Sequence, residues 1–138
     1  MKPLGVLEET RVVVATDADI VAARMHGRAL ATRLGFRATD ATLIATAISE
    51  LARNILLYAR RGEIALAVIE RGERRGLAVT ARDDGPGIRD VARALQDGYS
   101  TSGRLGLGLP GVRRLMDEFE IRSHAGEGTA VMAKKWNA

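Results

Sequence analysis

The sequence predicts a two-layer α+β sandwich, in which an antiparallel or mixed sheet carries its helices on one face. The first observation behind this prediction is the order of elements that the hydrophobic pattern indicates, β-α-α-β-β-α-α-β-β. Strands and helices are mixed but do not alternate strictly, as a doubly wound parallel sheet would require. The second is composition, because 138 residues with 46% hydrophobic side chains suffice for one core. We therefore expect a single domain over residues 1–138.

The first part of the chain predicts one strand followed by two helices. A β-branched run indicates a strand over residues 10–15. Asp17 is the expected N-cap of a first helix, and Gly35 is placed to end that helix in a left-handed turn. A second helix is expected from about residue 40 to residue 58. Its apolar face consists of Ile44, Ile48, Leu51 and Ile55.

The second part predicts two β-hairpins that are separated by helices and a long loop. The first hairpin is expected from strands over residues 62–71 and 77–82, joined by a turn over residues 72–76. The segments expected after it are a short helix over about 90–95, a Gly/Ser-rich loop over 97–108, a helix over about 110–118, and strands over about 120–125 and 128–136.

Composition excludes several classes of function. The chain has no cysteine, which excludes disulfides and thiolate chemistry and favours a cytoplasmic location. Its two histidines, His26 and His124, lack metal-ligand spacing, so we expect no zinc site. The net charge is +4, but the arginines are scattered and the few aromatic residues are not interleaved with a basic run. We therefore expect no nucleic-acid partner.

Membrane association is not expected either. No apolar run approaches the roughly 18–20 residues that a membrane helix needs. The N-terminus also lacks the apolar stretch and small-residue cleavage site of a signal peptide.

The second predicted helix carries a polar stripe with Glu50 and Asn54 on neighbouring turns. Mg²⁺ prefers oxygen ligands and keeps waters and nucleotide phosphates around it, so Asn54 is a candidate ligand. Glu50 is then a candidate general base for an attacking hydroxyl or water. Taken alone, the pair does not outweigh the simpler interpretation of an ordinary solvated helix face.

Asp83, Gly85 and Gly87 form a compact motif at the end of a predicted strand. The two glycines permit a sharp turn and close approach to a flat ligand, and the carboxylate suits an exocyclic amine. A plain turn has the same composition. Farther along the chain, the tight hairpin before Thr129 places a hydroxyl near the end of the sheet.

The long glycine-rich segment runs directly into a predicted helix. Exposed backbone N–H groups and a helix N-terminus favour anions, and hydroxyls and an arginine add donors for phosphate. The candidate residues are Ser102, Gly103, Arg104, Gly106 and Gly108. The segment lacks the endings of a P-loop and of a Rossmann turn. Long loops in compact domains are commonly functional, often as lids, although a linker has similar composition.

Together these motifs resemble, in order and spacing, the nucleotide-binding boxes of the GHKL ATPase/kinase superfamily. Within it, the chain resembles the RsbT-type serine/threonine switch kinases over nearly its whole length. The matching segments are residues 19–24, 50–54, 83–88, 100–103, 108–112, 114–119 and 126–129.

The resemblance implies the Bergerat ATP-binding fold, with ATP and Mg²⁺ as cofactors. It implies that Asn54 coordinates Mg²⁺ and that Glu50 is the catalytic base. Asp83 would bind the adenine amino group, Gly85 and Gly87 would shape the adenine pocket, and Thr129 would complete it. The glycines at positions 103, 106 and 108 would carry lid and phosphate contacts.

The resemblance also implies protein partners. These are STAS-domain proteins of a stressosome complex as substrates, and a PP2C-type phosphatase that the kinase activates after release. Two alternatives stay open, namely an anti-sigma factor kinase with the same chemistry and a non-catalytic adaptor that binds ATP to set its shape. A histidine kinase is disfavoured because the chain lacks a dimerisation helix bearing an acceptor histidine.

Overall fold

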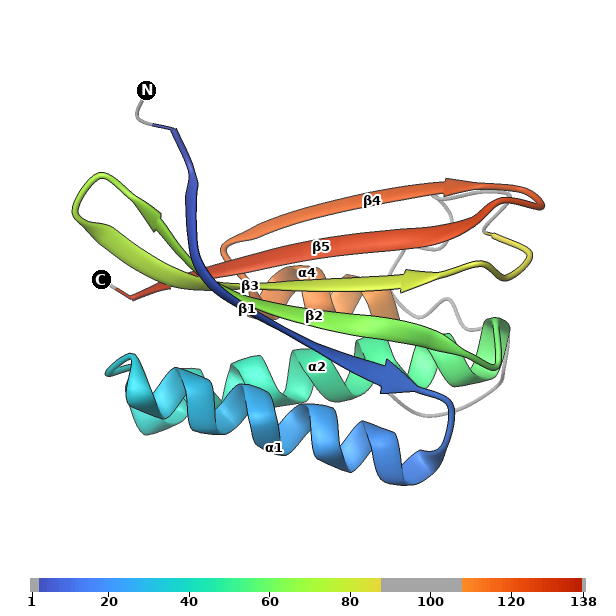
Figure 1. Ribbon diagram of the computed structural model, residues 1–138, viewed down its shortest axis with the longest axis horizontal. Coiled ribbons are helices and arrows are strands. Elements are labelled where there is room, and N and C mark those ends of the chain that lie inside the picture. Colours follow the sequence, from blue (N-terminus) through green and yellow to red (C-terminus); the bar gives the residue numbers. More distant parts are fainter. Residues whose placement is uncertain (1–2, 88–107, 138) are drawn as a thin grey trace.

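The computed structural model describes residues 3–87 and 108–137, and these residues have the predicted α+β architecture. The strands are β1 (Gly5–Val14), β2 (Gly62–Arg71), β3 (Arg74–Asp83), β4 (Glu118–His124) and β5 (Gly128–Asn137). The helices are α1 (Asp17–Arg33), α2 (Ala38–Tyr58) and α4 (Gly108–Leu115). They lie on one face of the sheet (Figure 1), which confirms the fold class. The helix expected over residues 90–95 is outside the described residues.

The sheet has five strands in the order β1-β2-β3-β5-β4, and every neighbouring pair is antiparallel. The hairpins β2-β3 and β4-β5 meet through β3 and β5, so chain segments about 50 residues apart become neighbours (Figure 1). This pairing places the turn of the β4-β5 hairpin beside the C-terminal end of β3.

Two strands, β1 and β3, begin three or more residues before the predicted position. The turn between β2 and β3 is shorter than expected, since Arg71 pairs with Arg74 and only two residues connect the strands. The strand β1 begins earlier, at Gly5 rather than residue 10. In both places the strand residues include exposed charged side chains, so the hydrophobic pattern does not indicate a strand there. Backbone pairing with the neighbouring strand forms these parts of the strands instead.

Helix α1 begins at Asp17, one residue earlier than predicted, because Thr16 and not Asp17 is the N-cap. The Thr16 side chain accepts from the Asp19 backbone N–H at 3.4 Å, and the Asp19 carboxylate accepts from the backbone N–H groups of Ala15 and Thr16 at 2.9 and 3.0 Å. These backbone donors lower the pKa of Asp19. The helix ends as predicted, with Gly35 in the left-handed region at a φ of 85°.

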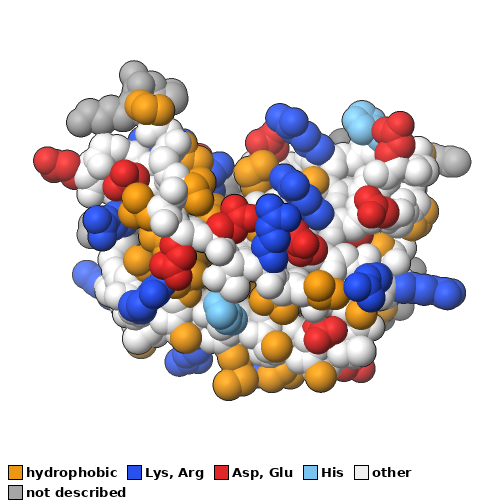
Figure 2. Space-filling model, in the orientation of Figure 1, with side chains coloured by type: hydrophobic (Ala, Val, Ile, Leu, Met, Phe, Trp, Pro, Cys, Tyr) orange, Lys and Arg blue, Asp and Glu red, His pale blue; other side chains and the backbone are white. Residues whose placement is uncertain are grey.

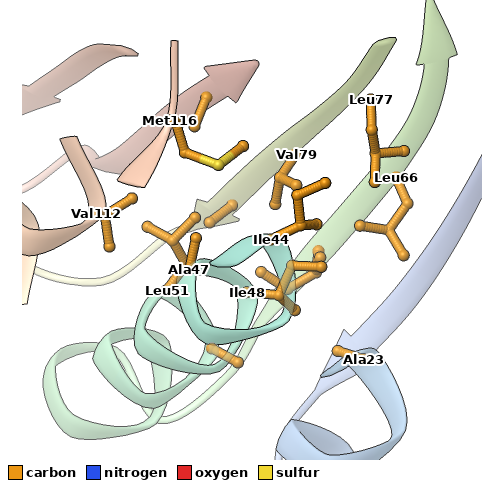
Figure 3. Packing of buried hydrophobic residues seen from close by; sticks show 14 of the residues in the cluster. Ala23, Ile44, Ala47, Ile48, Leu51, Leu66, Leu77, Val79, Val112 and Met116 are labelled. Atoms are coloured by element: carbon orange, nitrogen blue, oxygen red, sulfur yellow. The ribbon is translucent and has the colours of Figure 1, made fainter. Parts of the chain in front are cut away.

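Helix α2 is the centre of the core. Its predicted apolar face is buried against the sheet, and α1 and α4 pack on its two sides. Figure 3 shows Val112 and Met116, at the α4 end, beside Ala47 and Leu51 of α2. The contact between α1 and α2 is close at Gly27, where a Cβ would lie 2.1 Å from Cδ1 of Ile48.

A smaller apolar cluster lies on the sheet face that the helices leave open. Trp136 packs there with Ile69 and Ala78, and the guanidinium groups of Arg71 and Arg74 lie 5.2 and 4.9 Å from the centre of its ring. Exposed ion pairs lie on β1, between Arg11 and Glu9, and on β4, between Arg122 and Glu120, and Figure 2 shows positive and negative side chains interleaved on this view. None of the helices in residues 3–87 and 108–137 has the length and apolar character needed to span a membrane.

Candidate functional site

The edge of the sheet where β3 ends aligns one residue from each strand in a single row. In sheet order, the row consists of Val14, Gly62, Asp83, Thr129 and Ser123. Cross-strand partners point to the same face of a sheet. Ile55 of α2 packs at Gly62, where a Cβ would lie 2.7 Å from its Cγ2 atom. The row therefore faces the helices, and its members on β3, β5 and β4 are polar.

The turn that follows Asp83 packs against the C-terminal end of α2. Asp83 Oδ1 accepts a hydrogen bond from the backbone N–H of Gly85 at 2.9 Å. A Cβ at Gly85 would lie 2.6 Å from Cβ of Ala59, so only glycine permits this contact. Gly85 thus permits a close approach, but the group that it approaches in the structure is Ala59 and not a ligand.

The same turn is attached on its other side to the β4-β5 hairpin. The Pro86 carbonyl accepts from the backbone N–H of Gly126 at 2.6 Å. Gly87 has a φ of 77°, and a Cβ there would lie 2.1 Å from the His124 carbonyl oxygen. The turn is therefore held between α2 and the hairpin, which fixes the direction of the Asp83 side chain.

Thr129 lies next to Asp83 and is tied to Ser123. The hydroxyl oxygens of Ser123 and Thr129 are 2.8 Å apart, and Ser123 Oγ also donates to the Gly128 carbonyl at 3.1 Å. Sequence analysis did not single out Ser123. Strand alternation contained a signal for it, because Ser123 falls on the same face as Ile121.

Glu50 and Asn54 lie on α2, close to the polar row. Asn54 directly precedes Ile55, whose side chain packs at Gly62 of the row, and Glu50 lies one helical turn earlier. The Glu50 side chain is only 13% exposed and accepts from Arg53 Nη1 at 2.6 Å. Asn54 is half-buried. The predicted pair thus belongs to the same region as Asp83 and Thr129.

The glycine-rich segment is described only at its end. Gly108 starts α4 with a φ of 61°, and α4 packs on α2. The other candidate phosphate-binding residues, Ser102, Gly103, Arg104 and Gly106, lie outside the described residues.

Asn54 and Glu50 offer an amide oxygen and a carboxylate from neighbouring turns of α2. Among the described residues no three His, Cys, Asp or Glu side chains gather into a metal site. An amide oxygen and a carboxylate suit an ion that completes its shell with waters and nucleotide phosphates, as Mg²⁺ does. The residues therefore fit Mg²⁺ bound together with a nucleotide.

Comparison with known proteins decides the family. The family model described as "Histidine kinase-like ATPase domain" matches residues 13–135. The chain is 53% identical over 129 residues to serine/threonine-protein kinase RsbT of Bacillus subtilis, which covers 94% of this chain and 97% of that protein. The chain belongs to the histidine kinase-like ATPase domain family, as an RsbT-type member.

More distant relatives of this RsbT-type chain include anti-sigma F factors. One from Caldanaerobacter subterraneus is 32% identical over 97 residues, covering 67% of this chain and 68% of the relative. One from Pasteuria penetrans is 33% identical over 124 residues, covering 84% and 82%. Both matches are lower than the match to RsbT in identity and shorter in matched length.

The fold of the RsbT-type chain is also present in a solved structure, that of the RsbU and RsbW domains of a Mycobacterium tuberculosis protein. The TM-score is 0.62 at 19% identity, and the match covers 96% of this chain. This chain spans about a third of that one, 34%, so the likeness concerns the fold alone.

Proposed function

We propose that this RsbT-type chain transfers the γ-phosphoryl group of Mg·ATP to a Ser or Thr hydroxyl of STAS-domain proteins in a stressosome-like complex. Family membership makes it a serine/threonine-protein kinase, and the proposal concerns its site and its partners. On release, it binds and activates a PP2C-type phosphatase. We place it in the cytoplasm, where ATP is available, and take residues 1–138 as one kinase domain.

The base pocket in this proposal is the polar row at the sheet edge. The Asp83 carboxylate accepts from the adenine amino group, and Thr129 contacts the same edge of the base. Gly85 and Gly87 support the assignment, since each lies where a side chain would collide with Ala59 or His124 and displace the turn. A turn held this firmly presents its carboxylate in one direction, and placed polar groups of this kind fix the orientation of a ligand.

The observation that carries the catalytic proposal is the position of Glu50. Its carboxylate is largely shielded from solvent, is held by Arg53 and lies one turn from Asn54. In the proposed reaction Glu50 accepts the proton of the attacking Ser or Thr hydroxyl. The oxygen of that hydroxyl bonds to the γ-phosphorus as the bond to the leaving ADP oxygen breaks.

Asn54 is the proposed protein ligand of Mg²⁺. When bound there, the ion would supply positive charge beside the phosphates. Ser102, Gly103, Arg104, Gly106 and Gly108 are assigned to the phosphates and the lid on the strength of the family motifs. Gly108 begins α4, and the backbone N–H groups at the start of a helix, here those of residues other than Pro110, favour an anion.

Replacement of Glu50 by Gln tests the catalytic proposal. Because the amide cannot accept the proton, transfer of labelled γ-phosphate to the STAS-domain partner should fall by about 10²- to 10⁴-fold, while ATP affinity in calorimetry stays near wild type. Glu63→Gln is the matched control. It removes a carboxylate that forms only a 3.4 Å ion pair with Arg11 on the open sheet face, and it should leave transfer unchanged.

Other outcomes separate the alternatives. Transfer at the wild-type rate in Glu50→Gln would remove Glu50 from the role of base. ATP binding and partner binding by the wild type without any transfer would indicate the adaptor. Stable binding to a sigma factor in place of the phosphatase would indicate an anti-sigma factor, a function that the anti-sigma F relatives suggest.

A further inference from the structure

Two consecutive hydrogen bonds join the hydroxyl groups beside Asp83, and their donors and acceptors follow from the partners. Ser123 Oγ lies 3.1 Å from the Gly128 carbonyl oxygen and 2.8 Å from Thr129 Oγ1. A carbonyl only accepts, so Ser123 donates its single proton to Gly128. The bond between the two hydroxyls then has Thr129 as its donor. The proton of Thr129 is therefore used within the protein.

This direction determines what the polar row offers to a ligand. Thr129 presents only lone pairs, and the Asp83 carboxylate is also an acceptor. One oxygen of Asp83 is engaged by the Gly85 N–H at 2.9 Å, and for the other the described part of the chain supplies no hydrogen-bond donor. The two neighbouring side chains thus offer acceptors and no donor.

We propose that Ser123 is a specificity-determining residue. By accepting the hydrogen bond of the Thr129 hydroxyl, it makes the site select 6-aminopurine nucleotides over 6-oxopurine nucleotides. The inference rests on the proposed function, in which Asp83 and Thr129 line the base pocket. A 6-amino group carries two N–H donors and satisfies the acceptors. A 6-oxo group is itself an acceptor, so burying it against these acceptors leaves it without a donor, and only the adjoining ring N1–H of such a base can pair with one of them.

The test compares ATP with inosine triphosphate, which differs from ATP in the 6-position and the adjoining ring nitrogen. Dissociation constants for both, with Mg²⁺ present, are measured by calorimetry on the full chain. The informative pair is Ser123→Thr and Ser123→Val, which have nearly the same shape and differ in a hydroxyl. Both suit a strand, so both variants are expected to fold.

We expect the preference for ATP to persist in Ser123→Thr. In Ser123→Val the Thr129 hydroxyl is free to turn and donate to the 6-oxo group, and the preference should fall by about five- to tenfold. Asp83→Asn combined with Ser123→Val should lower the preference for ATP further, because the amide also offers an N–H donor. Thr80→Val removes a hydroxyl from the opposite face of β3 and should change nothing.

Equal preference in the Thr and Val variants, with ATP still bound, would overturn the role of Ser123. A parallel loss of affinity for both nucleotides in Ser123→Val would also overturn it, since that result indicates a structural effect without selection. Failure of the wild type to bind either nucleotide would overturn the proposed function itself. The two failures are therefore distinguishable.

Discussion

Gly126 and Gly128 have nearly the same backbone conformation, with φ angles of 81° and 89°, but different surroundings. A Cβ at Gly126 would meet no atom within 4 Å. A Cβ at Gly128 would lie 2.2 Å from the Asp83 carbonyl oxygen, which belongs to the backbone and cannot turn away. The two positions separate the cost of a left-handed conformation from the cost of a collision.

We expect Gly126→Ala to lower the free energy of unfolding by about 1 kcal/mol, from backbone strain alone. Gly128→Ala should lower it by about 3 kcal/mol, because the collision adds to the strain. It should also weaken ATP binding by displacing Asp83. Urea unfolding and calorimetry measure the two effects. Equal losses of stability would contradict the collision that separates the two positions.

At the scale of the elements, the close contact between α1 and α2 depends on glycine at position 27, which has no side chain. Gly27 is buried in α1, and Ile48 Cδ1 from α2 occupies the space that a Cβ would need. Glycine within a helix costs about 1 kcal/mol relative to alanine. The close approach of the two helices offsets that cost, because Ile48 is fully buried and fills the gap.

A pair of substitutions tests this packing. Gly27→Ala should destabilise the chain by about 1–2 kcal/mol despite the better helix propensity, and Ile48→Val by about 1 kcal/mol. The double variant should lose about 1 kcal/mol less than the sum, since Ile48→Val removes the atom that collides. Urea unfolding of the four proteins provides the comparison. Strict additivity would contradict the predicted contact.

At the scale of the whole molecule, the main core joins the helices to the sheet, while Trp136 lies in the separate cluster on the open face. Both clusters use side chains from β2, β3 and β5, so they share strands. If residues 1–138 form one domain, the two should unfold together.

Trp136 is the only tryptophan, so its fluorescence reports on the open-face cluster alone. We expect its urea transition to coincide in midpoint and slope with that of far-ultraviolet circular dichroism, which follows the helices. Transitions at separate urea concentrations would contradict the single-domain proposal.

Sequence reasoning reached some features of the site because they are local. The motifs around Glu50, Asp83 and Gly108 consist of residues close in sequence, and their chemistry can be recognised from spacing. The roles given to these residues stay predictions. Ser123 escaped notice because its importance depends on Thr129, which faces it only across a hairpin. Likewise, the reason for glycine at position 85 is a contact with Ala59 of α2.

The sequence by itself determined the order of the described elements, the fold class and the RsbT-type motifs, because periodicity, turn residues and short motifs are properties of neighbouring residues. Only the tertiary structure decided that β3 lies beside β5, and so that Asp83, Thr129 and Ser123 form one row. Strand order depends on how the whole sheet packs against α2, and hydrogen-bond direction depends on distances between atoms remote in the chain. No local pattern contains either.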